Sequence, residues 1–276
     1  MISAIIPTYR NPKYLDLCLK SAMENKVLDE TEIIVVVDGF PEESADVISK
    51  YKGIQVLNLP ENKGMQYALN VGVMNAKNKW VFIENDDNVF GPEWDKKFVE
   101  AIKAFNNPNY CIQINQVEPH LSIFDFVIKD FGTDVETFPY ERWLEYEPTI
   151  RNPKLMDARG RLFPFLITKK WYMTVGGFDT FYNSPFWCDA DFWLKLELTK
   201  QIEFVRWHGC HLYHFGSIAT KNREDAEANI FKKSEGDAAQ TFQYKWGYLP
   251  YLVEAAKLRN NSKLPLDKEI KGIRFN

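Results

Sequence analysis

The sequence predicts an α/β fold in which helices flank a mostly parallel central sheet. Over the first 115 residues, short apolar segments alternate with segments whose apolar residues recur at helical spacing. The segment EIIVVVDG, residues 32–39, is almost entirely aliphatic, as expected of a parallel strand buried on both faces. Strands that alternate with helices in this way are typical of parallel sheets with right-handed crossover connections.

Each element of this first half rests on a local pattern. SAIIP at 3–7 is a short apolar run that indicates a strand. In YLDLCLKSAMEN, residues 14–25, the apolar side chains recur at the spacing of one helix face. SADVISKY and GMQYALNVGVMNAK are expected helices, and IQVLNLP is the strand between them. A strand at 80–84, a helix at about 92–105 and the strand YCIQINQV at 110–117 follow.

The second half is less regular. Residues 118–160 mix aromatic with charged side chains, which fits either a substrate-binding insertion or peripheral packing. Regular patterns return over 161–179. DADFWLKLELTK at 189–200 predicts a helix, the segment at 202–217 indicates one or two strands, and the charged remainder is expected to be helical.

Composition narrows the possible partners. The chain has 276 residues, 45% of them hydrophobic, which is enough to bury a substantial core. Its 34 basic and 38 acidic residues give a net charge of −4. The strongly basic character of nucleic-acid-binding proteins is therefore absent, and we expect no nucleic acid partner.

Cysteine usage and apolar segments indicate a location. The four cysteines are scattered without a CxxC pair, which favours a reducing compartment over a zinc cluster or a disulfide framework. The apolar run at the start of the sequence is too short for a signal peptide, and no segment approaches the roughly 20 apolar residues that cross a bilayer. We expect a cytoplasmic protein that is at most peripheral at a membrane surface.

Polar residues follow four of the expected strands. They are Thr8-Tyr9, Asp38-Gly39, residues 60–63 and residues 85–88. In an open parallel sheet, ligands bind outside the carboxyl ends of the strands. We therefore expect these four loops to gather on one edge of the sheet and to form the functional site.

The segment NDDN at 85–88 has two interpretations. Asp and Asn favour turns because their side chains bond nearby backbone groups. Alternatively, Asp86 and Asp87 hold a hard divalent cation, which one or two carboxylates bind together with phosphate oxygens and water. Such an ion neutralises a diphosphate leaving group. The position of the pair beside the other polar loops favours the cation.

Five segments, in this order, resemble family 2 glycosyltransferases of the GT-A fold. They are AIIPTYRNPKYLDLCLKSA, EIIVVVDGFPEES, ENKGMQYALNVGVMNAKNKWVFIENDDNVF, VGGFDTFYNSPFWCDADFWLKL and YHFGS, and they span residues 2 to about 217. The resemblance implies inverting transfer of one sugar from a nucleotide diphosphate donor, with Mn²⁺ or Mg²⁺ as the cofactor. UDP is the expected nucleotide, and a glycan or glycolipid hydroxyl is the expected acceptor.

The resemblance also assigns roles in donor binding. Pro7, Thr8 and Tyr9 would border the base, Asp38 would accept a hydrogen bond from the base or ribose, Lys63 would lie near the nucleotide, and Asp86 and Asp87 would hold ribose and metal. The chain departs from the family pattern in two places. Val37-Asp38 replaces the usual pair of acids, and Asn85-Asp86-Asp87 replaces a spaced Asp-x-Asp, which makes Glu84 a further candidate ligand.

A catalytic base is expected in the second half. An inverting displacement needs a carboxylate within hydrogen-bond reach of the acceptor hydroxyl. Relatives carry Glu-Asp where this chain has Cys188-Asp189, so the resemblance implies Asp189 as the base, with Asp191 as the second choice. Either acid could instead cap the helix that follows. Lys245, in YKWG, is expected to close over the diphosphate.

Three histidines, His208, His211 and His214, lie close together in the sequence. They raise the possibility of a zinc site, but residues 211 and 214 of one strand would face opposite sides of the sheet. By resemblance, His214 is expected to complete the metal or diphosphate site. The alternative is a structural histidine.

The expected organisation has three parts. Residues 1–117 would form the nucleotide-sugar-binding half, residues 118–220 the acceptor-binding and catalytic half, and residues 221–276 a helical extension. Two other functions stay open. A sugar-nucleotide-forming nucleotidyltransferase would carry a glycine-rich loop after the first strand, and PTYRNPKY has no glycine. A non-catalytic carbohydrate- or nucleotide-binding module of the same fold would not need the four aspartates Asp38, Asp86, Asp87 and Asp189.

Overall fold

The computed structural model describes residues 1–120, 126–157, 162–182, 184–215 and 225–250, with the backbone alone for 225–234. Its strands are β1 (Ile2–Thr8), β2 (Glu32–Asp38), β3 (Gln55–Leu59), β4 (Trp80–Ile83), β5 (Asn88–Phe90), β6 (Tyr110–Glu118), β7 (Val127–Ile128), β8 (Asn152–Asp157), β9 (Phe165–Thr168) and β10 (Glu203–His214). Its helices are α1 (Pro12–Asn25), α2 (Pro41–Ser49), α3 (Met65–Asn75), α4 (Trp94–Phe105), α5 (Tyr140–Tyr146), α6 (Lys169–Thr174), α7 (Cys188–Leu198) and α9 (Asp225–Trp246), with short 3-10 helices η1 (Val135–Thr137) and η2 (Glu147–Ile150). The strand and helix segments expected within residues 1–117 are therefore confirmed, as are the expected helix at α7 and strand at β10. β5, β7, β8 and α5 were not predicted, and α2 begins earlier than expected, at Pro41. The helical structure expected for residues 221–276 is confirmed over α9, and residues 221–224 and 251–276 lie outside the described residues.

One sheet organises the molecule, in the order β3-β2-β1-β4-β9-β6-β10-β5, with β7 paired to β6 and β8 paired to β10. The strands of the first half, β3-β2-β1-β4, are all parallel. β9 lies antiparallel between β4 and β6, and β5 and β8 pair antiparallel with β10. The parallel prediction therefore holds for β3-β2-β1-β4, and the complete sheet is mixed.

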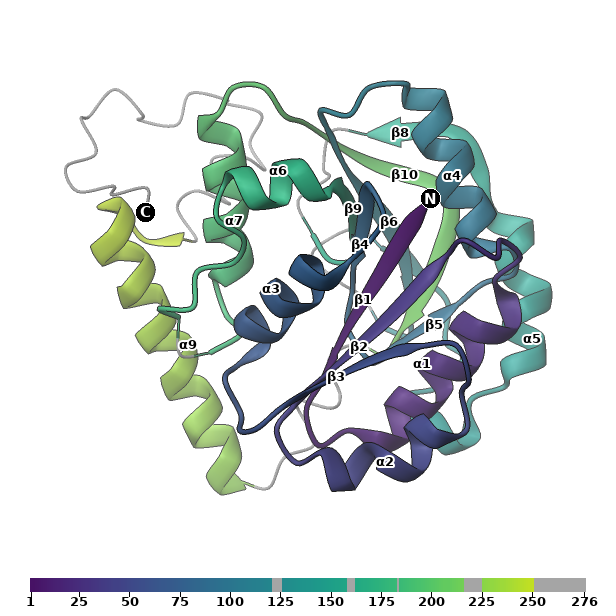
Figure 1. The fold of residues 1–276 in the computed structure, drawn as a ribbon, viewed down its shortest axis with the longest axis horizontal. Coiled ribbons are helices and arrows are strands. Elements are labelled where there is room, and N and C mark those ends of the chain that lie inside the picture. The colour runs from purple at the N-terminus through teal and green to yellow at the C-terminus, as the bar shows by residue number, and fades with distance from the viewer. Residues whose placement is uncertain (121–125, 158–161, 183, 216–224, 251–276) are drawn as a thin grey trace.

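Helices cover both faces of this sheet (Figure 1). Side chains of one strand alternate between the two faces, so Ile5 and Ile34 pack against α3, while Ile6 and Val35 pack on the side of α1 and α4. Helices α6, α7 and α9 lie on the α3 side. Because both faces are covered, β1 and β2 are buried along their lengths, which explains their continuous aliphatic sequence.

Part of the irregular segment 118–160 forms a third apolar cluster. Phe131, Phe138 and Trp143 are buried there against Tyr213 of β10. Trp143 also donates a hydrogen bond to the carbonyl of Phe90 at the end of β5. For these aromatic residues the structure supports the packing interpretation. No described helix is both long and apolar enough to cross a membrane.

Candidate active site

The predicted site lies where four parallel strands end. Thr8 pairs in register with Val37, so the loops after β1 and β2 lie side by side, and β1 also pairs with β4, which leads into the acidic segment. The convergence of these loops on one edge of the sheet is therefore confirmed. The geometry follows from parallel pairing, which points every carboxyl end in the same direction.

Asp86 is held by two side chains of the β1–α1 connection. Its carboxylate accepts hydrogen bonds from the Thr8 hydroxyl, at 2.6 Å, and from the Asn11 amide, at 3.0 Å. Burial and the neighbouring Asp87 carboxylate raise the pKa of Asp86 to about 7, while the two hydrogen bonds oppose the shift. Thr8, predicted to border the base, thus also orients Asp86.

Asp87 and His214 meet at the same edge. Asp87 is 8% exposed, and its Oδ2 lies 3.5 Å from Nε2 of His214, whose Nδ1 lies 2.7 Å from Oε1 of Glu118. Burial lowers the pKa of His214, but the two carboxylates outweigh burial and raise it to about 10. Oδ1 of Asp87 is buried and has no hydrogen-bond partner among the described residues. A buried carboxylate oxygen in this state is a candidate ligand atom.

The unpredicted strand β5 is what brings these groups together. In its antiparallel pairing with β10, Asn88 lies opposite His214. The residue directly before β5 is Asp87, so the pairing of β5 with β10 brings Asp87 next to His214. The two residues are more than 120 positions apart in the sequence, and only three pairs of residues in the two strands bring them together. Glu118 was also not predicted. It ends β6, so the rule that polar residues at strand ends form the site could have identified it.

Glu84 lies apart from this cluster. Its side chain is fully buried, and the Cys18 thiol of α1 lies 3.6 Å from its Oε1. Burial, together with the neighbouring Asp87 and Asp86 carboxylates, raises the pKa of Glu84 well above its usual range. The backbone N–H of Glu84 donates to Ile5, which continues the β1–β4 pairing. These contacts place Glu84 in the core at the end of β4.

Asp38 binds the loop before α3. Its Oδ1 accepts a hydrogen bond from the backbone N–H of Lys63, at 2.6 Å, and its Oδ2 accepts one from Gly64, at 2.8 Å. The Lys63 ammonium forms an ion pair with Glu61. Asp38 therefore fixes the position of the Asn62-Lys63-Gly64 turn, and its remaining lone pairs are the ones a nucleotide could use.

A pocket lies beside these loops. It has a volume of about 510 Å³ and is lined by Tyr9, Phe40, Pro41, Glu42, Pro60, Glu61 and Asn62. The Tyr9 and Phe40 rings meet edge to face, 6.1 Å apart. Pro7, in contrast, is buried within β1. Of the three residues predicted to border a base, Tyr9 alone lines this pocket.

The two candidate bases occupy different environments. Asp189 is half-buried in the first turn of α7, and one of its oxygens accepts a hydrogen bond from the N–H of Ala190. Asp191 is fully buried and accepts a hydrogen bond from Trp246, at 2.8 Å, with Lys245 also 2.7 Å away. An acceptor could approach Asp189 more readily than Asp191. Lys245, expected at the diphosphate, instead forms ion pairs with Asp179 and Asp191.

The start of α7 lies near the donor loops. Gln66, in the first turn of α3, donates a hydrogen bond to the carbonyl of Ser184 and also interacts with the Cys188 thiol. The same turn of α3 begins at Gly64, whose N–H binds Asp38. A short series of contacts thus joins Asp38 to the residue before Asp189, and places both on the same side of the molecule.

The other two histidines have separate partners. Nε2 of His208 lies 3.1 Å from Asp157, and Nδ1 of His211 lies 3.7 Å from Glu147. Among the residues that the structure describes, no group of three or more His, Cys, Asp or Glu side chains is arranged to hold a metal ion. The Asp87–His214 pair is thus a partial donor set, not a closed cage.

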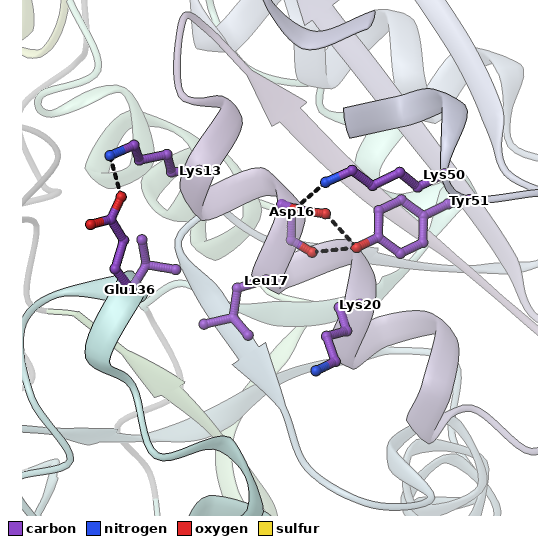
Figure 2. Close-up of a pocket in the computed structure, with 8 residues that line it drawn as sticks. Lys13, Asp16, Leu17, Lys20, Lys50, Tyr51 and Glu136 are labelled. Atoms are coloured by element: carbon purple, nitrogen blue, oxygen red, sulfur yellow. Dashed lines mark hydrogen bonds and ion pairs between the residues drawn. The ribbon is translucent and has the colours of Figure 1, made fainter. Parts of the chain in front are cut away.

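A second pocket lies along α1 (Figure 2). It is lined by Lys13, Asp16, Leu17, Lys20, Lys50, Tyr51, Val135 and Glu136, none of which is a predicted site residue. Its charges are largely internally paired. Lys13 binds Glu136, and Asp16 interacts with Lys50 and accepts a hydrogen bond from Tyr51 (Figure 2). This pocket therefore offers little charge for a ligand.

Known proteins with similar sequences are glycosyltransferases. The chain is 26% identical over 196 residues to an uncharacterized glycosyltransferase of Haemophilus influenzae, covering 71% of this chain and 62% of the relative. It is 24% identical over 250 residues to chondroitin synthase of Pasteurella multocida, covering 82% of this chain and 26% of that enzyme. The chain thus spans less than two thirds of the length of either relative.

Solved structures and a sequence family agree with this result. The crystal structure of S. aureus TarS superposes with a TM-score of 0.59 at 15% identity, covering 96% of this chain and 76% of the TarS chain. The fold is therefore that of the GT-A glycosyltransferases. Residues 3–176, more than half of the chain, match the sequence model of glycosyl transferase family 2. The chain belongs to glycosyl transferase family 2.

Proposed function

We propose that this glycosyltransferase moves one sugar, with inversion at the anomeric carbon, from a UDP-sugar to a hydroxyl of a glycan or glycolipid. The observation that carries the proposal is the buried Oδ1 of Asp87, which has no hydrogen-bond partner in the described part of the chain and lies beside His214 and next to the oriented Asp86. The structure of S. aureus TarS in complex with UDP supports the choice of nucleotide. The similarity to chondroitin synthase supports a glycan product.

The donor would bind along the edge formed by the first half of the sheet. Tyr9 and the pocket beside Phe40 would take the base, and Asp38 and Lys63 would contact the nucleotide from the turn that Asp38 fixes. Asp86 would bind the ribose. We assign residues 1–117 to this donor half, residues 118–220 to acceptor binding and catalysis, and residues 221–276 to a helical extension.

A divalent cation fits the residues at this edge. Mg²⁺ and Mn²⁺ prefer oxygen ligands and are commonly held by one or two carboxylates together with substrate phosphates, so a complete protein cage is not required. Asp87, with Asp86, would hold the ion, and His214 could join them as the neutral imidazole once the incoming cation displaces the proton that Asp87 and Glu118 favour. When bound, the ion supplies positive charge that stabilises the departing diphosphate.

For the displacement at the anomeric carbon, we assign the role of general base to Asp189 of α7. Asp189 would accept the proton of the acceptor hydroxyl as the hydroxyl oxygen attacks the anomeric carbon. The bond from that carbon to the β-phosphate oxygen breaks, and the nucleoside diphosphate leaves with the electron pair. Because attack and departure occur on opposite faces of the sugar, the anomeric configuration inverts.

The first test uses hydrolysis of the donor in place of transfer. A panel of UDP-sugars is incubated with the protein and Mn²⁺, and released UDP is measured. We expect turnover with at least one donor, its loss on chelation with EDTA, and its loss in Asp87→Ala. Turnover that persists in Asp87→Ala and in EDTA would contradict the metal assignment, and release of pyrophosphate from UTP and a sugar phosphate would favour the nucleotidyltransferase.

The second test addresses the base. Asp189→Asn should lower hydrolysis by about 10²- to 10⁴-fold, the usual contribution of general base catalysis, with UDP affinity unchanged. Glu197→Gln, at the other end of the same helix, is the matched control. Normal turnover in Asp189→Asn would remove Asp189 from the mechanism.

A further inference from the structure

A buried ionic cluster joins the described end of the chain to α7. Asp191 is 0% exposed, and its Oδ1 accepts a hydrogen bond from Nε1 of Trp246 at 2.8 Å. Nζ of Lys245 lies 2.7 Å from the same oxygen. Phe242 and Trp246 pack into the core that contains Phe192 of α7. The end of α9 is therefore fixed to α7 by apolar packing and by charge.

The same cluster reaches the loop before α7. Lys245 also pairs with Asp179 at 2.5 Å, and Asp179 accepts a hydrogen bond from the N–H of Phe181. Tyr182 donates a hydrogen bond to Asp191 at 3.4 Å. One ammonium group thus connects two carboxylates from the two segments that precede and carry Asp189.

The first turn of α7 depends on these contacts. Its N-cap residue, Trp187, has a left-handed backbone conformation (φ 59°) and supplies no side-chain cap. A tryptophan with this φ is strained, and such residues persist only where surrounding contacts hold them. Asp191 lies one half-turn beyond Asp189, so contacts that hold Asp191 also fix the helix backbone from which Asp189 projects.

A buried carboxylate keeps its charge only while its partners remain. Removing one partner of a buried ion pair leaves an uncompensated charge, which the structure relieves by moving or by admitting water. Loss of Lys245 would therefore take from Asp191 the nearer of the two lysines that face it, leaving Lys195 at 3.5 Å, and would loosen the turn that carries Asp189. The donor half of the sheet has no residue in this cluster and would stay unchanged.

We propose that Lys245 and Trp246 are positioning residues for catalysis, which dock α9 onto Asp191 and Asp179 so that Asp189 is held in its reactive orientation. The inference rests on the proposed function, in which Asp189 is the base. It assigns to Lys245 and Trp246 of α9 an indirect part in catalysis, through Asp191 and Asp179.

The first experiment compares hydrolysis of the UDP-sugar with binding of UDP and Mn²⁺. Lys245→Met should lower turnover by about tenfold to a hundredfold, as small misplacements of catalytic groups do. The dissociation constant of UDP should stay unchanged, and Lys245→Arg should restore part of the turnover. Lys103→Met, an exposed lysine of α4, is the matched control. Equal losses of turnover and UDP affinity, or full turnover in Lys245→Met, would overturn the proposal.

A double variant separates positioning from general damage. If Lys245 acts through Asp189, then Lys245→Met should lower turnover no further once Asp189→Asn is present. Two losses that multiply would show that Lys245 acts independently of the base, against the proposal. Asp179→Asn, which removes one partner only and keeps the shape, should give a smaller loss and covers the case in which Lys245→Met folds poorly.

Amide hydrogen exchange tests the connection between α9 and the start of α7 without any UDP-sugar. In Lys245→Met, amides at the start of α7 should exchange at least about tenfold faster, while those of β1 and β4 should keep their rates. Unchanged exchange at residues 188–191 would overturn the proposal. Because this measurement needs no nucleotide, it decides the role of α9 even if no UDP-sugar is hydrolysed, a result that would count against the proposed function alone.

Discussion

Individual carboxylates of this protein differ in what their oxygen atoms contact. Asp95, fully buried in α4, accepts hydrogen bonds from the N–H groups of Val27 and Leu28 and from the Thr31 hydroxyl. Asp38 similarly binds two backbone N–H groups. Asp87 keeps an oxygen without such a partner. Asp87 thus differs from Asp95 and Asp38 in having lone pairs of a buried oxygen available to a ligand.

We predict that Asp95→Ala lowers the free energy of unfolding by about 3 kcal/mol, because three hydrogen bonds to a fully buried, charged acceptor are lost. Urea denaturation measures the change through a lower midpoint with an unchanged slope. Affinity for UDP should not change, since Asp95 lies outside the proposed site. A midpoint equal to that of the wild type would show that water replaces the carboxylate at no cost.

The loops that follow the strands set the geometry of the candidate site. Gly39 has a φ of +81°, and a Cβ at this position would lie 2.7 Å from the backbone nitrogen of Asn62. The loop after β2 therefore packs directly against the loop after β3, with no room for a side chain. The pocket beside Tyr9 lies between these two loops. Its shape depends on this close backbone contact.

We predict that Gly39→Ala destabilises the fold by at least about 1–2 kcal/mol, from the strained φ alone, and also weakens UDP binding. Thermal unfolding and calorimetry measure the two effects. Gly53→Ala is the control, because Gly53 shares the positive φ but has open space around it. The control should lose stability and keep UDP affinity. Equal UDP affinity in both variants would exclude the pocket as the base site.

The docking of α9 should depend on pH. Burial raises the pKa of Asp179, but Lys245 outweighs burial and the net pKa lies below 3.8. The pKa of Lys245 is lowered by burial and raised more strongly by Asp191 and Asp179, to a net value above 10.5. The other groups that face this pair are Lys195 and Tyr182.

The contribution of the ionised Asp179 to the stability of the fold is complete above its unfolded-state pKa. This contribution is lost as the pH falls through the folded-state pKa. The contribution of the charged Lys245 to stability is complete below its unfolded-state pKa of 10.5 and is lost as the pH rises through its higher folded-state pKa.

We therefore predict that the stability difference between wild type and Lys245→Met is constant between about pH 5 and 9 and shrinks below about pH 4. Thermal midpoints of both proteins across this range provide the test. Lys103→Met should match the wild type at every pH. A difference that persists unchanged at pH 3 would show that packing of α9, not charge, accounts for the effect.

One sheet runs through the described part of the molecule, and the proposed donor site lies at the loops that follow its parallel strands β1, β2, β3 and β4. Such a protein should gain stability from a ligand that bridges the loops of the first half. We predict that UDP with Mn²⁺, at a hundred times the dissociation constant, stabilises the fold by about 2.7 kcal/mol and raises the unfolding midpoint by several degrees. EDTA should remove most of this shift, and UMP, which lacks the second phosphate, should give a smaller one. An equal shift in EDTA would contradict metal-assisted binding.

Local patterns were sufficient for the first half of the fold. The aliphatic run of β2 and the helical spacing of α1 predicted both elements, because each depends on periodicities that neighbouring residues already show. β5 has only three residues, too few to display a period, and it forms because β10 offers a free edge. β9 lies antiparallel between β4 and β6, and the sequence of a single strand does not specify which strands it will pair with.

The candidate site was likewise predicted from sequence only in part. Sequence alone placed Asp38, Asp86 and Asp87 at one edge, since polar residues at the ends of parallel strands must converge. Tertiary structure decided that Asp38 binds the Lys63 turn, that Glu118 supports His214, and that Asp191 anchors α9. The physical reason is distance along the chain. Sequence patterns report on neighbours within a few residues, whereas these contacts join residues from 25 to 96 positions apart and exist only once the sheet is assembled.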